Sequence, residues 1–193
     1  MSQELIERTL ILAKHDALQR GLVGEIIKRF EQRGFKIAGT KMIVPTEEML
    51  GKHYADDYDW KVNTGNKTIE VLKQKGRSTN ETPEEIGNKV RAWNIAGLRG
   101  SPVIAIIFEG YHAIEIGRKI VGHTEPRTAV SGTIRGDYST ESYDLADNQK
   151  RVIRSIVHAS GNRKEAENEI KIWFKPEEVF DWKRKDWDVI HGI

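Results

Sequence analysis

The hydrophobic pattern of the first 44 residues alternates between strand and helix periods. A continuous apolar run predicts a buried strand over residues 9–14. Residues 22–33 predict a helix that ends at Gly34, because hydrophobic side chains recur there at helical spacing: Val23, Ile26, Ile27 and Phe30. Residues 35–44 are again typical of a strand. This part of the chain therefore predicts a β-α-β order.

A polar region separates this start from the next strongly apolar run. Thr46 is expected to begin a short helix over residues 46–57, since acidic residues occupy its first turn. Residues 61–97 are rich in Gly, Asn and Lys and predict two weaker helices on either side of the turn sequence GRSTNETP. We interpret residues 61–97 as an insertion.

The second half of the chain predicts two further strands. Residues 101–110 form the most apolar run and predict a central strand, and residues 111–122 predict the helix that follows it. A long loop over 123–150 is expected before a strand that ends at Val157. The order β-α-β-β-α-β predicts an α+β, ferredoxin-like antiparallel sheet with helices on one face, plus the inserted helical segment.

Composition limits the class of protein. With 193 residues, 38% hydrophobic and 31% charged, residues 1–193 are expected to form one domain that carries insertions. No segment approaches the roughly 18 consecutive apolar residues that cross a bilayer, and the N-terminus does not resemble a secretory signal. The absence of cysteine excludes disulfides, a thiol nucleophile and cysteine zinc sites. We expect a cytoplasmic protein that has no membrane partner.

The charge balance bears on partners. The chain has 31 basic and 29 acidic residues and a formal charge of +2, so nucleic acid is not expected as its main partner.

His158 is the first candidate for chemistry. Residues 155–157 are typical of a strand end, while Asn162 with Glu165 three residues later predicts a capped helix start. His158 would then lie at the mouth of a strand-to-helix connection, where side chains meet solvent. A buried histidine that bonds a backbone carbonyl is the commoner alternative, and the local sequence leaves both open.

Three cations on separate elements are candidates for binding an anion: Lys14 at a strand end, Arg118 late in its helix and Arg135 in a loop between two glycines. Each also has an inert alternative, as a solvated side chain or a partner of the helix dipole. Neither standard phosphate-cradling glycine motif follows a strand. The remaining histidines, which we interpret as surface residues without metal-ligand spacing, are His15, His53, His112, His123 and His191.

Several ordered blocks of sequence go further than composition and spacing. They are ERTLILAKHDALQRGLVGEIIKRFEQRGFKIAG, HYAD, GRKIVGHTEP, SGTIRGDY and IVHASGNRKEAENEIKIWF. In this order they resemble the nucleoside diphosphate kinase family, and the regions 61–97 and 139–151 resemble an elongated subset of it. The resemblance implies a ferredoxin-like phosphotransferase that moves the γ-phosphoryl group of a nucleoside triphosphate onto a histidine, and then onto a nucleoside diphosphate.

The resemblance also implies roles for particular residues. His158 matches the phosphoacceptor, and Glu169 matches a glutamate that orients its ring. The family's phosphate and sugar contacts match Lys14, Arg118 and Arg135. Thr124 matches a hydroxyl that contacts phosphate, and Tyr54 matches a tyrosine near the histidine in the nucleotide site. Magnesium would be held mainly through the nucleotide's phosphates, so we predict no protein metal ligand. A homo-oligomer, hexameric or tetrameric, is also expected from the family alone.

Three departures from the family pattern concern the sugar and the metal. Ser155 stands where an asparagine normally contacts the ribose 3′-hydroxyl, His15 replaces a proline, and Gly161 replaces an aspartate. Trp60 and Val152 are the candidates for the two walls around the base. A catalytically weak nucleotide-binding relative and a nucleic-acid-binding relative remain the alternative functions.

Overall fold

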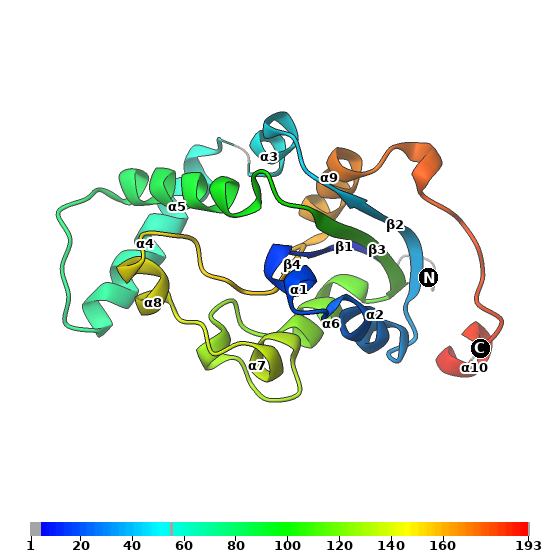
Figure 1. Cartoon of the computed structure of the whole chain (residues 1–193). Coiled ribbons are helices and arrows are strands. Elements are labelled where there is room, and N and C mark those ends of the chain that lie inside the picture. Colours follow the sequence, from blue (N-terminus) through cyan, green and yellow to red (C-terminus); the bar gives the residue numbers. More distant parts are fainter. Residues whose placement is uncertain (1–4, 55, 193) are drawn as a thin grey trace.

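One antiparallel sheet of four strands organises the chain, in the spatial order β2-β3-β1-β4 (Figure 1). This computed structural model describes residues 5–54 and 56–192. The strands are β1 (Ile6–Ala13), β2 (Lys36–Ile43), β3 (Val103–Tyr111) and β4 (Val157–Ala159).

Two helices complete the β-α-β-β-α-β order, which confirms the predicted α+β fold class: α2 (Val23–Glu31) joins β1 to β2, and α6 (Ala113–Val121) joins β3 to β4. The remaining helices are α1 (His15–Gln19), α3 (Glu47–His53), α4 (Tyr58–Gln74), α5 (Pro83–Leu98), α7 (Ile134–Tyr138), α8 (Tyr143–Asn148), α9 (Arg163–Trp173) and α10 (Trp187–His191). Short 3₁₀ turns lie at Pro126–Thr128 and Pro176–Glu178.

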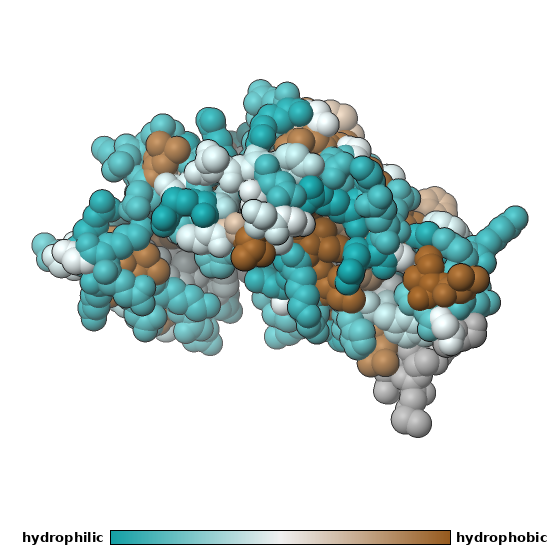
Figure 2. Space-filling view, turned by 90° about the horizontal axis from the view of Figure 1, so that it is seen from below, coloured by the Kyte–Doolittle hydropathy of each residue, from teal (hydrophilic) through white to brown (hydrophobic). Residues whose placement is uncertain are grey.

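The surface is mostly hydrophilic on the face seen in Figure 2, where hydrophobic residues form separate patches. Among the described residues, no helix combines the length and the apolar character that a bilayer span requires.

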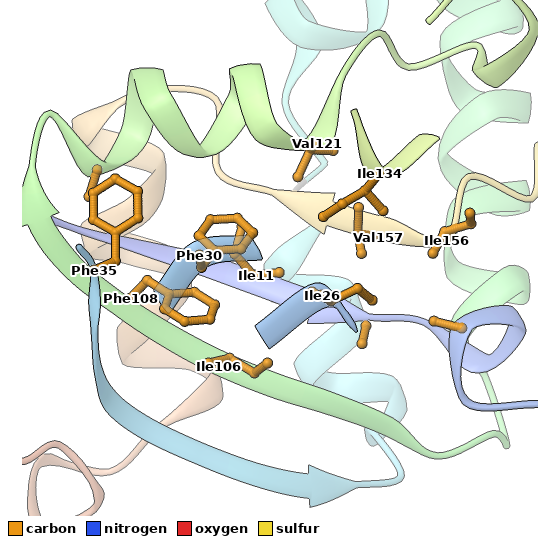
Figure 3. Close-up of a cluster of buried hydrophobic side chains, with 13 residues drawn as sticks. Ile11, Ile26, Phe30, Phe35, Ile106, Phe108, Val121, Ile134, Ile156 and Val157 are labelled. Atoms are coloured by element: carbon orange, nitrogen blue, oxygen red, sulfur yellow. The ribbon is translucent and has the colours of Figure 1, made fainter. Parts of the chain in front are cut away.

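The hydrophobic core lies on both faces of the sheet. On one face Ile11 packs with Phe30 of α2 and Val121 of α6 (Figure 3). On the other face Leu12 belongs to a cluster with side chains from α3, α5 and α9: Leu50, Leu98 and Trp173. Helices therefore cover both faces, and the expectation of helices on one face was wrong. The physical reason is that β1 is apolar at consecutive positions from Leu10 to Ala13, all fully buried, so neither face can be left to water.

Some predicted boundaries differ from the structure. The helix expected over 46–57 starts at its Thr46 cap but ends at His53, and Ala55 lies outside the described residues. The loop expected over 123–150 contains α7 and α8, which begin after Thr133 and Ser142. Each of these side chains accepts a hydrogen bond from a backbone N–H of its helix, which stabilises a short helix in polar sequence.

The strand that carries His158 is short and begins later than predicted. Ser155 and Ile156 precede β4 rather than belonging to it, and His158 lies at its centre, opposite Leu12 of β1. Ile156 breaks the strand because its φ of 64° lies in the left-handed region, which a β-branched residue rarely adopts. Its N–H donates to Asp16 Oδ2 at 2.9 Å and its carbonyl accepts from the N–H of Lys14, so neighbouring groups hold this conformation.

Helices α4 and α5 form a lobe at one side of the sheet, with α8 beside them (Figure 1). The lobe confirms the two helices predicted on either side of GRSTNETP. Glycines allow close packing of the pair, since a Cβ on Gly87 of α5 would overlap the backbone of Lys61 in α4. Leu98 at the end of α5 is 1% exposed and joins the core, so the lobe is anchored to the sheet.

The close packing of α4 and α5 gives a stability prediction. Gly87→Ala should destabilise the protein by about 1–3 kcal/mol, because the added methyl group meets rigid backbone. Gly24→Ala in α2 is the matched control, since open space surrounds that helical glycine and alanine should stabilise it by roughly 0.5–1 kcal/mol. Urea unfolding measures both, and equal effects would contradict the packing argument.

Candidate active site

A cavity of about 260 Å³ gathers most of the residues predicted for nucleotide binding. It lies where the end of β1 and strand β4 meet α6, α7 and α5. The predicted residues that line it are Lys14, Tyr54, Arg118, Thr124, Arg135, Ser155 and His158. Glu169 lies behind His158, so the structure brings the whole predicted set together.

The ring of His158 is fixed from one side. Its Nε2 lies 2.9 Å from Glu169 Oε1. A buried carboxylate accepts and does not donate, so Nε2 carries the hydrogen and Nδ1 keeps its lone pair. His158 is partly exposed and lines the cavity. The imidazole therefore presents a nucleophilic nitrogen.

Glu169 stays ionised although it is only 7% exposed. Burial alone would raise the pKa of its carboxyl, but the positive charge of the His158 ring when it is protonated, with the hydrogen bonds from His158 and Ser160, brings the pKa below its usual value. Ser160 Oγ donates to Oε2 at 2.6 Å. Asn162 caps α9 as predicted by accepting from the N–H of Glu165, and this start sets the position of Glu169 one turn later.

Two predicted cations are tied to the segment before β4. Lys14 Nζ donates to Ser155 Oγ at 3.0 Å, and burial lowers the pKa of Lys14 to about 8, an effect to which Arg135 adds. Arg135 is not in a loop, as expected, but in α7, and it is 8% exposed. Its Nε and Nη2 donate to the carbonyls of Ser155 and Val157, and Nη1 to that of Gly122. The alternative of a solvated arginine in an exposed turn is therefore wrong.

Arg118 and Thr124 are exposed and line the cavity from the end of α6 and the segment after it. Tyr54 lines it from the end of α3, and burial together with the charge of Glu169 raises the pKa of its hydroxyl. Cations, hydroxyls and one nucleophile thus surround a space that fits a phosphate chain.

Sequence reasoning missed Asn94 of α5, which lines the cavity beside Val152. Asn94 lies in a polar stretch without a pattern of its own, so no signal marked it. Val152 does line the cavity, as expected of a wall. Trp60 is not among the described residues that line the cavity and is 37% exposed on α4, and its place beside the base stays a prediction.

His53 was expected on the surface, and this was wrong. Its side chain has no exposed area, and its ring stands edge-on to that of His158, with 4.7 Å between centroids. Trp173 Nε1 donates to His53 Nδ1 at 3.1 Å. The pattern could not reveal this burial, because His53 ends a short polar helix.

His53, His158 and Glu169 bring three potential metal-ligating atoms within 4.8 Å of one another. Hydrogen bonds already engage these side chains, and two ring nitrogens do not suit Mg²⁺, which prefers oxygen. Within the trio only His158 and Glu169 are hydrogen-bonded to each other, while His53 accepts from Trp173.

The burial of His53 predicts a pH dependence of stability. Burial, with the charge of His158, lowers the pKa of His53 from 6.5 to about 3. Between these values the unfolded chain binds a proton at His53 that the folded protein does not bind, so stability falls as pH falls through this window, by up to about 1.4 kcal/mol per pH unit. His53→Gln, which keeps an acceptor for Trp173, should make the dependence shallower. Urea unfolding at pH 6, 5 and 4 tests this, and parallel curves for the two proteins would contradict it.

Comparisons with known proteins agree with the geometry. The family model of nucleoside diphosphate kinase matches residues 7–69 and 93–179. The chain is 39% identical over 181 residues to a nucleoside diphosphate kinase of Pyrobaculum aerophilum (91% of this chain and 99% of that protein) and 37% identical to nucleoside diphosphate kinase A of Mus musculus (92% and 91%).

Solved structures are similar as well. The fold is similar to that of the NDP kinase from Pyrobaculum aerophilum, with a TM-score of 0.87 and 38% identity over 91% of this chain and all of that one. It is also similar to the Borrelia burgdorferi nucleoside-diphosphate kinase, a transition-state mimic with bound vanadate and ADP, with a TM-score of 0.78 and 34% identity over 96% and 97% of the two chains. These findings confirm the predicted resemblance and phosphotransferase class: the chain belongs to the nucleoside diphosphate kinase family.

Proposed function

We propose that this chain transfers the γ-phosphoryl group of a nucleoside triphosphate to a nucleoside diphosphate through a phosphohistidine at His158. The observation that carries the proposal is the pairing of His158 Nε2 with the buried Glu169 carboxylate, which leaves Nδ1 for a cavity lined by cations. A general base is unnecessary, because the neutral ring already has a lone pair.

The reaction has two half-steps. Nδ1 attacks the γ-phosphorus, the bond from that phosphorus to the bridging oxygen breaks, and the nucleoside diphosphate leaves with the bonding electrons. Glu169 stabilises the positive charge that develops on the ring by accepting the Nε2–H hydrogen bond. A second nucleoside diphosphate then attacks the phosphohistidine through its terminal oxygen, and the ring returns to its first state.

The cations would stabilise the charge that spreads over the transferred oxygens. Arg118 is exposed in the lining and would meet the phosphates directly. Arg135 has five N–H groups, of which the carbonyl bonds use three, so two remain for a phosphate. Lys14, with its lowered pKa, would contribute one donor beside Ser155.

Magnesium is the divalent ion that we propose for this reaction. When bound, it would neutralise phosphate charge and align the phosphate chain. The lining fits an ion held mainly by the nucleotide: its acidic member among the described residues is Glu165, whose oxygens accept from the Gly161 N–H and Asn162 Nδ2. A Cβ on Gly161 would lie 2.5 Å from Glu165 Oε2, so Glu165 takes the space that a larger residue 161 would need.

The organisation of the chain and its surroundings also remain proposals. We propose one domain over 1–193 with an insertion at about 61–97, supported by a family match that leaves residues 70–92 outside. The lengthened region at about 139–151 contains α8, whose Asp144 pairs with Lys75 of the lobe at 2.9 Å. A homo-oligomer stays a prediction from the family resemblance, and a cytoplasmic location stays a prediction from composition and the N-terminal sequence.

Incubation with MgATP alone should label His158. The expected product is an acid-labile, base-stable phosphoprotein, and His158→Ala should abolish it, because the attacking nitrogen is gone. His191→Ala near the C-terminus is the control and should label normally. Persistent label in His158→Ala would place the nucleophile elsewhere.

Ser155 should make a weak contact with the ribose 3′-hydroxyl, because it is 5% exposed and its Oγ already accepts from Lys14. Ser155→Asn adds an amide and should lower the KM of diphosphate acceptors by up to a few fold, the effect of a hydrogen bond of roughly 0.5–1.5 kcal/mol. A 3′-deoxy acceptor lacks the target group and should show no gain. Equal gains with both acceptors would indicate repacking around His158 instead.

A further inference from the structure

We propose that Trp173 and His53 are positioning residues that reserve one carboxylate oxygen of Glu169 for His158. The inference rests on the proposed function, since it assigns these residues to the phosphoacceptor. Neither residue touches the nucleotide in this role. Both would act on catalysis through Glu169.

The hydrogen bond from Trp173 fixes the tautomer of His53. An indole N–H can only donate, so His53 Nδ1, 3.1 Å away, must be the unprotonated ring nitrogen. The ring has no exposed area, and burial lowers its pKa to about 3, so it stays neutral with its hydrogen on Nε2.

This tautomer decides which histidine Glu169 binds. Glu169 Oε1 lies 2.9 Å from His158 Nε2 and 3.6 Å from His53 Nδ1. Because Nδ1 carries no hydrogen, it offers nothing to the carboxylate, and Oε1 accepts from His158. If the hydrogen moved to Nδ1, a small shift would let His53 donate to the same oxygen.

The indole N–H is the group that opposes this shift. His53 Nε2 is buried and has no hydrogen-bond partner among the described residues, so nothing in that part of the chain holds the hydrogen on Nε2. The other tautomer would gain a charge-assisted bond to Glu169, which makes it a competitor. Ser160 occupies the second carboxylate oxygen and therefore does not shield Oε1.

The test begins with Trp173→Phe, which keeps a buried aromatic ring and removes the N–H. Nitrogen-15 NMR of the histidine rings should place the His53 hydrogen on Nε2 in the natural protein and on Nδ1 in the variant. When both His53 and His158 donate to Glu169 Oε1, the hydrogen bond to His158 weakens. We expect kcat to fall by about ten-fold, which corresponds to loss of part of a hydrogen bond to a charged group, and the KM for ADP to stay within about two-fold of its original value. Trp187→Phe is the matched control, because Trp187 is also buried and its ring centroid lies 4.2 Å from that of His191. In this control variant, neither kcat nor the His53 tautomer should change.

A second substitution separates tautomer control from packing. His53→Leu removes the competing donor, so the double variant His53→Leu/Trp173→Phe should regain most of the kcat lost in Trp173→Phe. If Trp173→Phe does not fold, benzothienylalanine at position 173 removes the N–H from a ring of nearly the same shape, and the same results are expected.

Three results would overturn the inference: a hydrogen on His53 Nδ1 in the natural protein, no change of tautomer on loss of the indole N–H, or a double variant as slow as Trp173→Phe. The NMR measurement needs no substrate. It stands even if His158 is never phosphorylated, which would instead contradict the proposed function.

Discussion

The hydrogen bond between His158 and the Glu169 carboxylate is the interaction on which the site depends. A charge that is 7% exposed needs donors, and His158 and Ser160 supply them from β4 and the residue that follows it. This requires α9 to begin where Asn162 caps it and to end where Trp173 enters the core. The same carboxylate that costs free energy to bury therefore fixes the orientation of the His158 ring, the proposed phosphoacceptor.

The backbone before His158 shows a second constraint. Residues 155 and 156 precede the regular strand, and side chains distant in sequence bind the backbone groups here: Asp16 accepts from the Ile156 N–H, and Arg135 donates to the carbonyls of Ser155 and Val157. These bonds hold Ile156 at a positive φ, which costs about 1–3 kcal/mol in isolation. Arg135 and Asp16 thus fix the backbone segment that lines the cavity through Ser155 and Val157. Arg135 also retains N–H donors for a ligand.

The α4–α5 lobe contributes Asn94 to the lining of the cavity. Val152, in the segment that leads to β4, lines the same cavity. Arg91 of α5 donates to the carbonyl of Tyr54 at 2.7 Å, which ties the lobe to the end of α3. Leu98 anchors the other end of α5 in the core. The lobe is therefore part of the pocket architecture, even though residues 70–92 lie outside the family match.

The sequence by itself determined the strand and helix order, since strong periodic patterns such as those of residues 9–14 and 22–33 depend on local spacing. Through family resemblance it also selected His158, Glu169 and the cations as candidates, because those residues stand in recognisable ordered blocks. Tertiary structure alone decided that helices cover both faces, that Arg135 is buried under β4, and that His53 packs against His158. The physical reason is that burial and hydrogen-bond partners are set by side chains far apart in the chain, such as Trp173 and His53 at a separation of 120 residues, which no local pattern encodes.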